Sequence, residues 1–140
     1  MGGRKAQFRH REVENPMIVG IGVDITALER IKGLQDRHGD RFLNRIYTEG
    51  EKTYCRSYSD SIPHLAARFA AKEATYKALG GVGSIRWKEI EVHNDDRGKP
   101  LLRLHGETRT VADEAGVRFA HLTLAHDAGV AVAQVVLEGD

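Results

Sequence analysis

The alternation of side chains predicts that the chain opens with a β-strand over residues 18–25. One side of this strand is β-branched, at Val19, Ile21, Val23 and Ile25, and the other carries Gly20, Gly22 and Asp24. Glycine leaves the face of a strand bare. The pair therefore predicts that another element approaches closely beside Asp24.

Helical spacing of apolar residues follows this strand. Four helices are predicted, over residues 26–34, 41–47, 48–56 and 62–79. Thr48 and Glu51 form a Thr-x-x-Glu capping box at the start of the third. The fourth is the longest, and two consecutive glycines end it.

The second half of the chain is rich in β-structure. Strands are predicted over residues 88–93, 100–104, 118–126 and 130–137, with one helix over residues 107–115. The last strand is apolar on both faces, which places it in the middle of a sheet. We therefore expect an α+β fold, in which an antiparallel sheet packs against a long helix and shorter helices.

Length and charge narrow the class of protein. The 140 residues fit a single domain over residues 16–140, preceded by a polar segment, 1–15, that we interpret as a flexible tail without the apolar stretch of a signal peptide. Lys and Arg number 21 against 20 Asp and Glu, so a net charge of +1 argues against a nucleic-acid binder. No apolar run is long enough for a membrane span. Cys55 is the single cysteine, which favours a reducing cytoplasm.

Asp24 and Glu73 are the first candidates for chemistry. A carboxylate within an apolar strand is costly unless it is paired or binds a cation; the alternative role for Asp24 is to cap the next helix. Glu73 and Lys77 lie one helical turn apart, which is also the spacing of a stabilising pair on an exposed helix. If the two carboxylates meet, they form an incomplete oxygen site suited to Mg²⁺, with Lys77 placed to neutralise a phosphoryl group.

Two groups of motifs resemble one family. The run Gly-Ile-Gly-Val-Asp-Ile at 20–25 is similar to the opening of holo-(acyl-carrier-protein) synthases, which are 4′-phosphopantetheinyl transferases. The segment Arg-Phe-Ala-Ala-Lys-Glu-Ala at 68–74, followed by Lys77, resembles the signature of the same enzymes. Residues 98–100 and 121–126 occur in the family's order and spacing, so the resemblance covers about residues 18–137.

The resemblance implies transfer of 4′-phosphopantetheine from coenzyme A to a serine of an apo acyl carrier protein, in fatty-acid or polyketide synthesis. Adenosine 3′,5′-bisphosphate is the second product. By position, Asp24 and Glu73 would hold Mg²⁺, and Glu73, directly or through a water on the metal, would take the serine proton. Coenzyme A would be held by Arg68, Lys72, Lys77 and His121.

The resemblance also implies partners. The exposed arginines of the region after the first strand would bind the acidic helix of the carrier protein; they are Arg30, Arg37, Arg41 and Arg45. Short members of the family are homotrimers with active sites shared between subunits, so we expect a trimer. Residues 58–64 lack the lysines and arginines that some members place there, which suggests that Arg68 and a neighbouring subunit's Arg97 or Lys99 hold the 3′-phosphate.

Two other classes of function remain open from the residues. One is a non-catalytic module that binds a nucleotide or a carrier protein through its arginines and has no need of Asp24, Glu73 and Lys77. The other is a nuclease or phosphatase, which usually has more carboxylates than this chain can bring together.

Overall fold

The structure is a computed structural model that describes residues 17–139. The predicted tail, residues 1–15, lies outside the described residues. In chain order the elements are β1 (Ile18–Ala27), α1 (Leu28–His38), α2 (Asp40–Ile46), α3 (Glu49–Arg56), α4 (Ile62–Ala78), the 3₁₀ turn η2 (Trp87–Glu89), β2 (Ile90–Asn94), β3 (Pro100–Leu104), α5 (Gly106–Glu114), β4 (Val117–Asp127) and β5 (Val130–Gly139).

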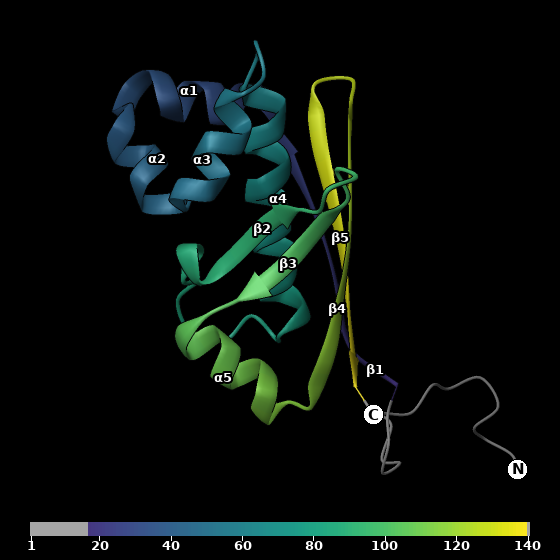
Figure 1. Ribbon diagram of the computed structural model, residues 1–140. Helices are drawn as coiled ribbons and strands as arrows, with labels where there is room; N and C mark the ends of the chain where they lie inside the picture. The colour runs from purple at the N-terminus through teal and green to yellow at the C-terminus, as the bar shows by residue number, and fades with distance from the viewer. Residues whose placement is uncertain (1–16, 140) are drawn as a thin grey trace, which may run out of the picture.

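An antiparallel three-stranded sheet in the order β1-β5-β4 forms one layer, and β2 and β3 form a separate hairpin. Helix α4 packs on one face of the large sheet, while α1, α2 and α3 cluster beyond it (Figure 1). The α+β prediction and the central position of the last strand are confirmed.

The two glycines of β1 allow α4 to approach very closely. A Cβ atom added at Gly20 would lie 2.0 Å from the carbonyl oxygen of Ala78, and one at Gly22 would lie 1.8 Å from that of Ala74. Both distances are far below van der Waals contact, so no side chain fits at either position. The close approach predicted beside Asp24 is that of the α4 backbone.

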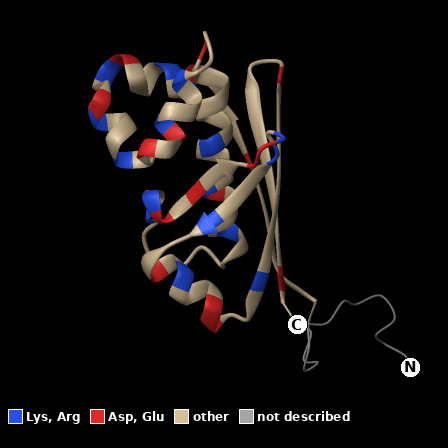
Figure 2. Cartoon of the chain, viewed as in Figure 1, with Lys and Arg blue, Asp and Glu red and all other residues tan. Residues whose placement is uncertain are grey.

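The β-branched side of β1 faces away from α4 and is exposed from Ile21 onward, whereas Val19, beside a register shift of the strand, packs against the core. Ile21, Val23 and Ile25 keep 57%, 54% and 64% of their surface accessible. They align with Val136, Gln134 and Val132 on β5, which makes one continuous face of the sheet. Figure 2 shows few charged residues on these strands and many on α1–α3. This exposed face, with its branched apolar side chains on β1, therefore remains uncovered within one chain.

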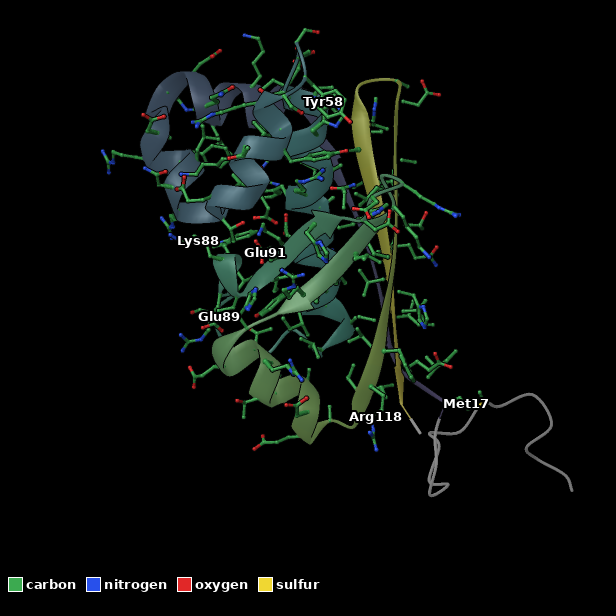
Figure 3. The ribbon with its side chains drawn as sticks, viewed as in Figure 1. Met17, Tyr58, Lys88, Glu89, Glu91 and Arg118 are labelled. Carbon is green, nitrogen blue, oxygen red and sulfur yellow. The ribbon has the colours of Figure 1, made fainter. Side chains whose placement is uncertain are left out.

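Residues of the third helix connect the helical cluster to the hairpin. The predicted capping box is present, with Thr48 Oγ1 accepting from the Glu51 backbone N–H and Glu51 accepting from that of Thr48. Thr48 Oγ1 also donates to Glu91 on β2 at 2.8 Å, just below α3 in Figure 3. These bonds fix the start of α3 against β2.

The first predicted helix and the strand expected from residue 88 have wrong boundaries. The helix expected over residues 26–34 begins at Leu28, because pairing with β5 keeps the backbone extended to Ala27, and it continues to His38. The strand expected from residue 88 begins only at Ile90, after the turn η2. Lys72 accounts for the turn, since its buried ammonium draws in the carbonyls of Trp87 and Ile90.

Within residues 17–139, none of the helices is both long enough and apolar enough to cross a membrane.

Candidate active site

Asp24 and Lys77 meet where β1 lies against α4. Lys77 Nζ donates to Asp24 Oδ1 at 2.7 Å, and Thr26 Oγ1 donates to the other carboxylate oxygen at 3.3 Å. The Asp24 side chain is 11% exposed and that of Lys77 is 54% exposed. The hydrogen bond to Asp24, followed by the charge of that carboxylate, raises the pKa of Lys77. Lys77 is therefore a cation that Asp24 holds in place and that is exposed enough to contact a ligand.

Glu73 lies one turn earlier on α4 and is half-buried. Burial, and after it the negative charge of Asp24, raise the pKa of Glu73, while the positive charges of Arg30 and Lys77 oppose the increase. Its Oε1 atom is buried and makes no hydrogen bond with any described residue. A buried carboxylate oxygen without a partner is costly, and it marks Glu73 as a group ready to bind a proton or a cation.

The simpler roles considered for these residues are wrong. Asp24 does not cap α1, because Ala27 occupies the N-cap position and no side chain caps that end. Lys77 pairs with Asp24 on the neighbouring strand, rather than with Glu73 on its own helix. The long helix and the first strand thus bring together the three side chains that the sequence singled out.

The two carboxylates suit a hard cation. Asp24 and Glu73 lie close enough for the charge of one to act on the other, and Glu73 Oε1 has an unused lone pair. Over residues 17–139, no group of three or more His, Cys, Asp or Glu side chains surrounds a possible metal position. The protein thus offers two oxygen ligands, a set that fits Mg²⁺ sharing its other positions between water and phosphate.

Lys72 does not belong to this site, and its predicted contact with coenzyme A is wrong. The side chain is fully buried on another face of α4. Its ammonium donates to Glu51 Oε1 at 2.8 Å and to the carbonyl oxygens of Trp87 and Ile90 at 3.0 and 2.6 Å. Three acceptors occupy its three donors, so Lys72 holds α4, α3 and β2 together.

Arg68 lies one turn before Lys72 and is also buried. Its guanidinium stacks on the ring of Tyr54, 4.1 Å from the centroid, and donates to Asn94 at the end of β2. Asn94 in turn donates to the carbonyl of Gly98 at 2.9 Å. Arg68 is thereby linked to the turn that carries Arg97 and Lys99 of the same chain, while its Nε makes no hydrogen bond with the described residues.

Aromatic and imidazole rings cover the outer side of Arg68, in the segment that lacks the expected basic residues. Tyr58 stacks on His64 with 3.6 Å between ring centroids, and His64 lies 6.2 Å from His126. Figure 3 shows Tyr58 beside the turn between β4 and β5. Burial, then the charges of Arg68 and His126, lower the pKa of His64.

His121 lies on the opposite face of the sheet from Asp24. It stands on β4 opposite Val136, on the exposed side, and its Nε2 lies 2.8 Å from Glu138 Oε1. The sheet itself separates His121 from Glu73 and Lys77. Within one chain, His121 is therefore not brought to the carboxylate site.

The four arginines predicted to bind a partner are exposed, but they divide into two groups. Arg41 and Arg45 border a cavity of about 370 Å³, whose apolar lining includes Phe42, Phe69 and Trp87, and Arg37 lies near it on α1. Arg30 instead lies next to the carboxylate site, with Nη1 3.9 Å from Glu73 Oε1.

Sequence reasoning missed Glu51 and Asn94, which position the lysine and arginine of the signature segment. The capping-box pattern revealed only the local role of Glu51. Nothing in the spacing of Asn94 reveals its contact with Arg68, because that contact joins residues 26 positions apart.

Comparison with known proteins decides the family. A profile of the 4′-phosphopantetheinyl transferase superfamily matches residues 20–133. The chain belongs to this superfamily. The holo-(acyl-carrier-protein) synthase of Halothermothrix orenii is 46% identical over 123 residues, which cover 87% of this chain and 98% of the relative.

Solved structures of this family have the same fold. The crystal structure of holo-(acyl-carrier-protein) synthase from Neisseria meningitidis matches with a TM-score of 0.80 and 34% identity, over 87% of this chain and 99% of the other. That of the Bacillus anthracis synthase, in complex with CoA (3′,5′-ADP), matches with a TM-score of 0.72 and 42% identity, over 89% and 99%. The predicted family and fold are confirmed.

Proposed function

We propose that this protein transfers 4′-phosphopantetheine from coenzyme A to a serine of an apo acyl carrier protein and releases adenosine 3′,5′-bisphosphate. The observation that carries the proposal is the meeting of Asp24, Glu73 and Lys77 at the contact between β1 and α4. The names of its relatives, and the coenzyme A ligand of the Bacillus anthracis enzyme, support the same reaction. A pure binding module has no use for a buried carboxylate oxygen that accepts no hydrogen bond from the described residues.

Asp24 and Glu73 would hold Mg²⁺. Their negative charges, and the unpaired Oε1 of Glu73, fit a cation that prefers oxygen ligands. When bound there, the metal supplies positive charge to the oxygens of the coenzyme A pyrophosphate. Lys77 pairs with Asp24 and so compensates one of the two negative charges of the carboxylates.

The protein's own side chains move the proton and balance the charge. The serine oxygen forms a bond to the phosphorus that carries pantetheine, and the bond from that phosphorus to the oxygen of adenosine 3′,5′-bisphosphate breaks. Glu73, whose pKa is raised by burial, takes the proton of the serine hydroxyl. Lys77 neutralises the charge that builds on the departing phosphate.

Coenzyme A would be held by Lys77 at its pyrophosphate and by Arg68 with the turn over residues 95–99. The bonds from Arg68 to Asn94 and from Asn94 to Gly98 support this arrangement, because they link Arg68 to that turn. His121 would contribute only to the site of a neighbouring copy, since it stands on the far face of its own sheet.

The exposed face of the sheet supports a homotrimer. Its branched side chains on β1 adjoin Val132 and Val136 of β5 and form a large apolar surface, which is unusual for a monomer. Packing copies of this face together would bury it and carry His121 toward a partner. In such a trimer the active site would be shared between subunits.

The carrier protein would bind where Arg41 and Arg45 border the apolar cavity, with Arg37 on the adjacent helix α1. An acidic, amphipathic helix matches this combination of positive rim and apolar floor. Cys55, a free buried thiol, agrees with the reducing cytoplasm in which we place the enzyme.

The intact mass of an apo acyl carrier protein, after incubation with this protein, coenzyme A and Mg²⁺, tests the reaction. We expect a gain of one phosphopantetheine that EDTA abolishes. Asp24→Asn and Glu73→Gln should each lower kcat/KM by about 100-fold or more, the usual effect of removing a group that stabilises the transition state.

Glu114→Gln, an exposed carboxylate on α5, is the matched control and should retain full activity. Circular dichroism of each variant separates lost chemistry from lost folding. Transfer at the normal rate by folded Glu73→Gln would refute the assignment, and binding of the carrier without any transfer would favour the module.

A further inference from the structure

Arg30 is shared between the carboxylate site and the surface proposed for the carrier protein. It lies on α1, with its guanidinium over the ring of Phe69 at 5.0 Å and Nη1 at 3.9 Å from Glu73 Oε1. Phe69 also lines the cavity bordered by Arg41 and Arg45. Arg30 therefore lies against one residue of each site, Glu73 of the carboxylate pair and Phe69 of the cavity lining.

The contact between Arg30 and Glu73 is easily exchanged. At 3.9 Å it is too long for a hydrogen bond, and Glu73 Oε1 has no other partner among the described residues. The Arg30 side chain is 57% exposed, so it moves without breaking a packed core. Exposed ion pairs of this kind contribute little stability.

A metal ion and the carrier protein would both favour movement of Arg30 away from Glu73. A divalent cation on Asp24 and Glu73 is repelled by a guanidinium beside the same carboxylate. A carboxylate of an acidic carrier attracts that guanidinium and draws it away from Glu73. Since the positive charge of Arg30 acts on Glu73, its departure leaves that carboxylate free for the metal.

We infer that Arg30 couples the two sites: it neutralises Glu73 while the carrier is absent and moves to the acidic carrier when it docks, so that carrier binding strengthens Mg²⁺ binding. This inference rests on the proposed function. By thermodynamic linkage Mg²⁺ strengthens carrier binding by the same factor. The metal site would be completed mainly when the acceptor protein is present.

Titration calorimetry of Mg²⁺ binding tests the coupling without turnover. The protein is saturated with coenzyme A, with and without a saturating carrier protein whose acceptor serine is replaced by alanine. For the wild type we expect the carrier to lower the Kd of Mg²⁺ by about fivefold or more, within the usual range of coupling between sites.

Arg30→Gln should bind Mg²⁺ several-fold more tightly than the wild type when the carrier is absent, and saturating carrier should change that Kd less than twofold. Lys32→Gln is the control for charge, because it removes one positive charge from the same helix, where Lys32 pairs with Asp36. It should keep the coupling of the wild type.

An unchanged Mg²⁺ affinity in carrier-free Arg30→Gln, or a carrier effect that survives in this variant, would overturn the inference. If the mass assay shows transfer but wild-type Mg²⁺ binding ignores the carrier, only the coupling is wrong. If the wild type neither binds Mg²⁺ nor modifies the carrier, the proposed function fails and the coupling with it.

Discussion

Neighbouring residues on α4 have opposite environments. The Lys72 ammonium is enclosed by Glu51 and two carbonyls, and burial is the main cause that lowers its pKa, opposed by the charge of Glu51. Glu73, the next residue, turns to the carboxylate site and keeps an oxygen that accepts no hydrogen bond from the described residues. Consecutive residues of a helix point in directions about 100° apart. Lys72 therefore forms a structural ion pair with Glu51, while Glu73 faces the carboxylate site.

Replacing Lys72 should therefore damage stability. Lys72→Met leaves the buried Glu51 carboxylate without its counter-charge, which typically costs about 3–5 kcal/mol. Lys32→Met, which breaks an exposed ion pair with Asp36, should change the free energy of unfolding by less than about 0.5 kcal/mol. Urea denaturation monitored by circular dichroism measures both. Equal effects of the two substitutions would show that the Lys72 pair is not structural.

Cys55 should be inert in the folded protein. Burial is the main reason that the pKa of its thiol rises from 9.0 to about 11. The thiolate fraction at pH 8 is then about 100-fold smaller than for an unshifted thiol, and the buried sulfur is out of reach of reagents. We expect iodoacetamide to label the protein rapidly in urea and hardly at all in native buffer, as followed by intact mass. Rapid native labelling would instead show that α3 opens readily.

At the scale of elements, the contact between β1 and α4 builds the site. The bare glycine face lets the helix backbone lie directly on the strand, so Asp24, on that same face, comes within 2.7 Å of Lys77. A strand with side chains at these positions would hold the helix several ångströms away. The two glycines therefore affect the site only by allowing β1 and α4 to lie close together.

Gly22→Ala should disrupt this contact. Its Cβ would lie 1.8 Å from a backbone carbonyl oxygen, which cannot turn aside as a side chain does. We expect a loss of about 3 kcal/mol or more, at the upper end of overpacking effects, with loss of activity. Gly33→Ala on α1 is the matched control, since its Cβ meets only the flexible end of Arg37 and alanine favours a helix. Thermal unfolding that ranks the two variants in the reverse order would contradict the packing argument.

At the scale of the whole molecule, the sheet has one covered face and one exposed apolar face. Val23 lies on the exposed side, midway along the edge strand β1, and pairs with Gln134 of β5. Helix α4 covers the other side, as Figure 1 shows. The exposed side also carries His121, so any copy that covers it meets a polar group with its own acidic partner, Glu138.

A charged side chain introduced on this exposed face of the sheet should prevent formation of the trimer. Val23→Lys places an ammonium within the proposed interface, where it would be buried without a counter-charge. Light scattering after size-exclusion chromatography should show the wild type as a trimer and Val23→Lys as a monomer with little activity. Val111→Lys, at an exposed apolar position on α5, should remain trimeric. A monomeric wild type, or a trimeric Val23→Lys, would refute the interface.

The sequence alone determined the elements and the pair of motifs at Asp24 and Glu73, because these depend on local spacing. N-capping, helix termination at glycine and apolar periodicity each depend on residues a few positions apart. The helices over residues 48–56 and 62–79 were therefore predicted almost to their ends. The boundary at Thr26 failed because a long-range strand pairing overrode a local helix signal.

Only the tertiary structure decided which side of each element meets which neighbour. The branched side of β1, which a local rule would bury, faces outward because the glycine side alone admits the backbone of α4. The same packing buries Lys72 with Glu51 and brings Arg30 to Glu73 rather than to the other arginines. These contacts join residues from 21 to 43 positions apart, and their geometry depends on the docking of whole elements rather than on spacing along the chain.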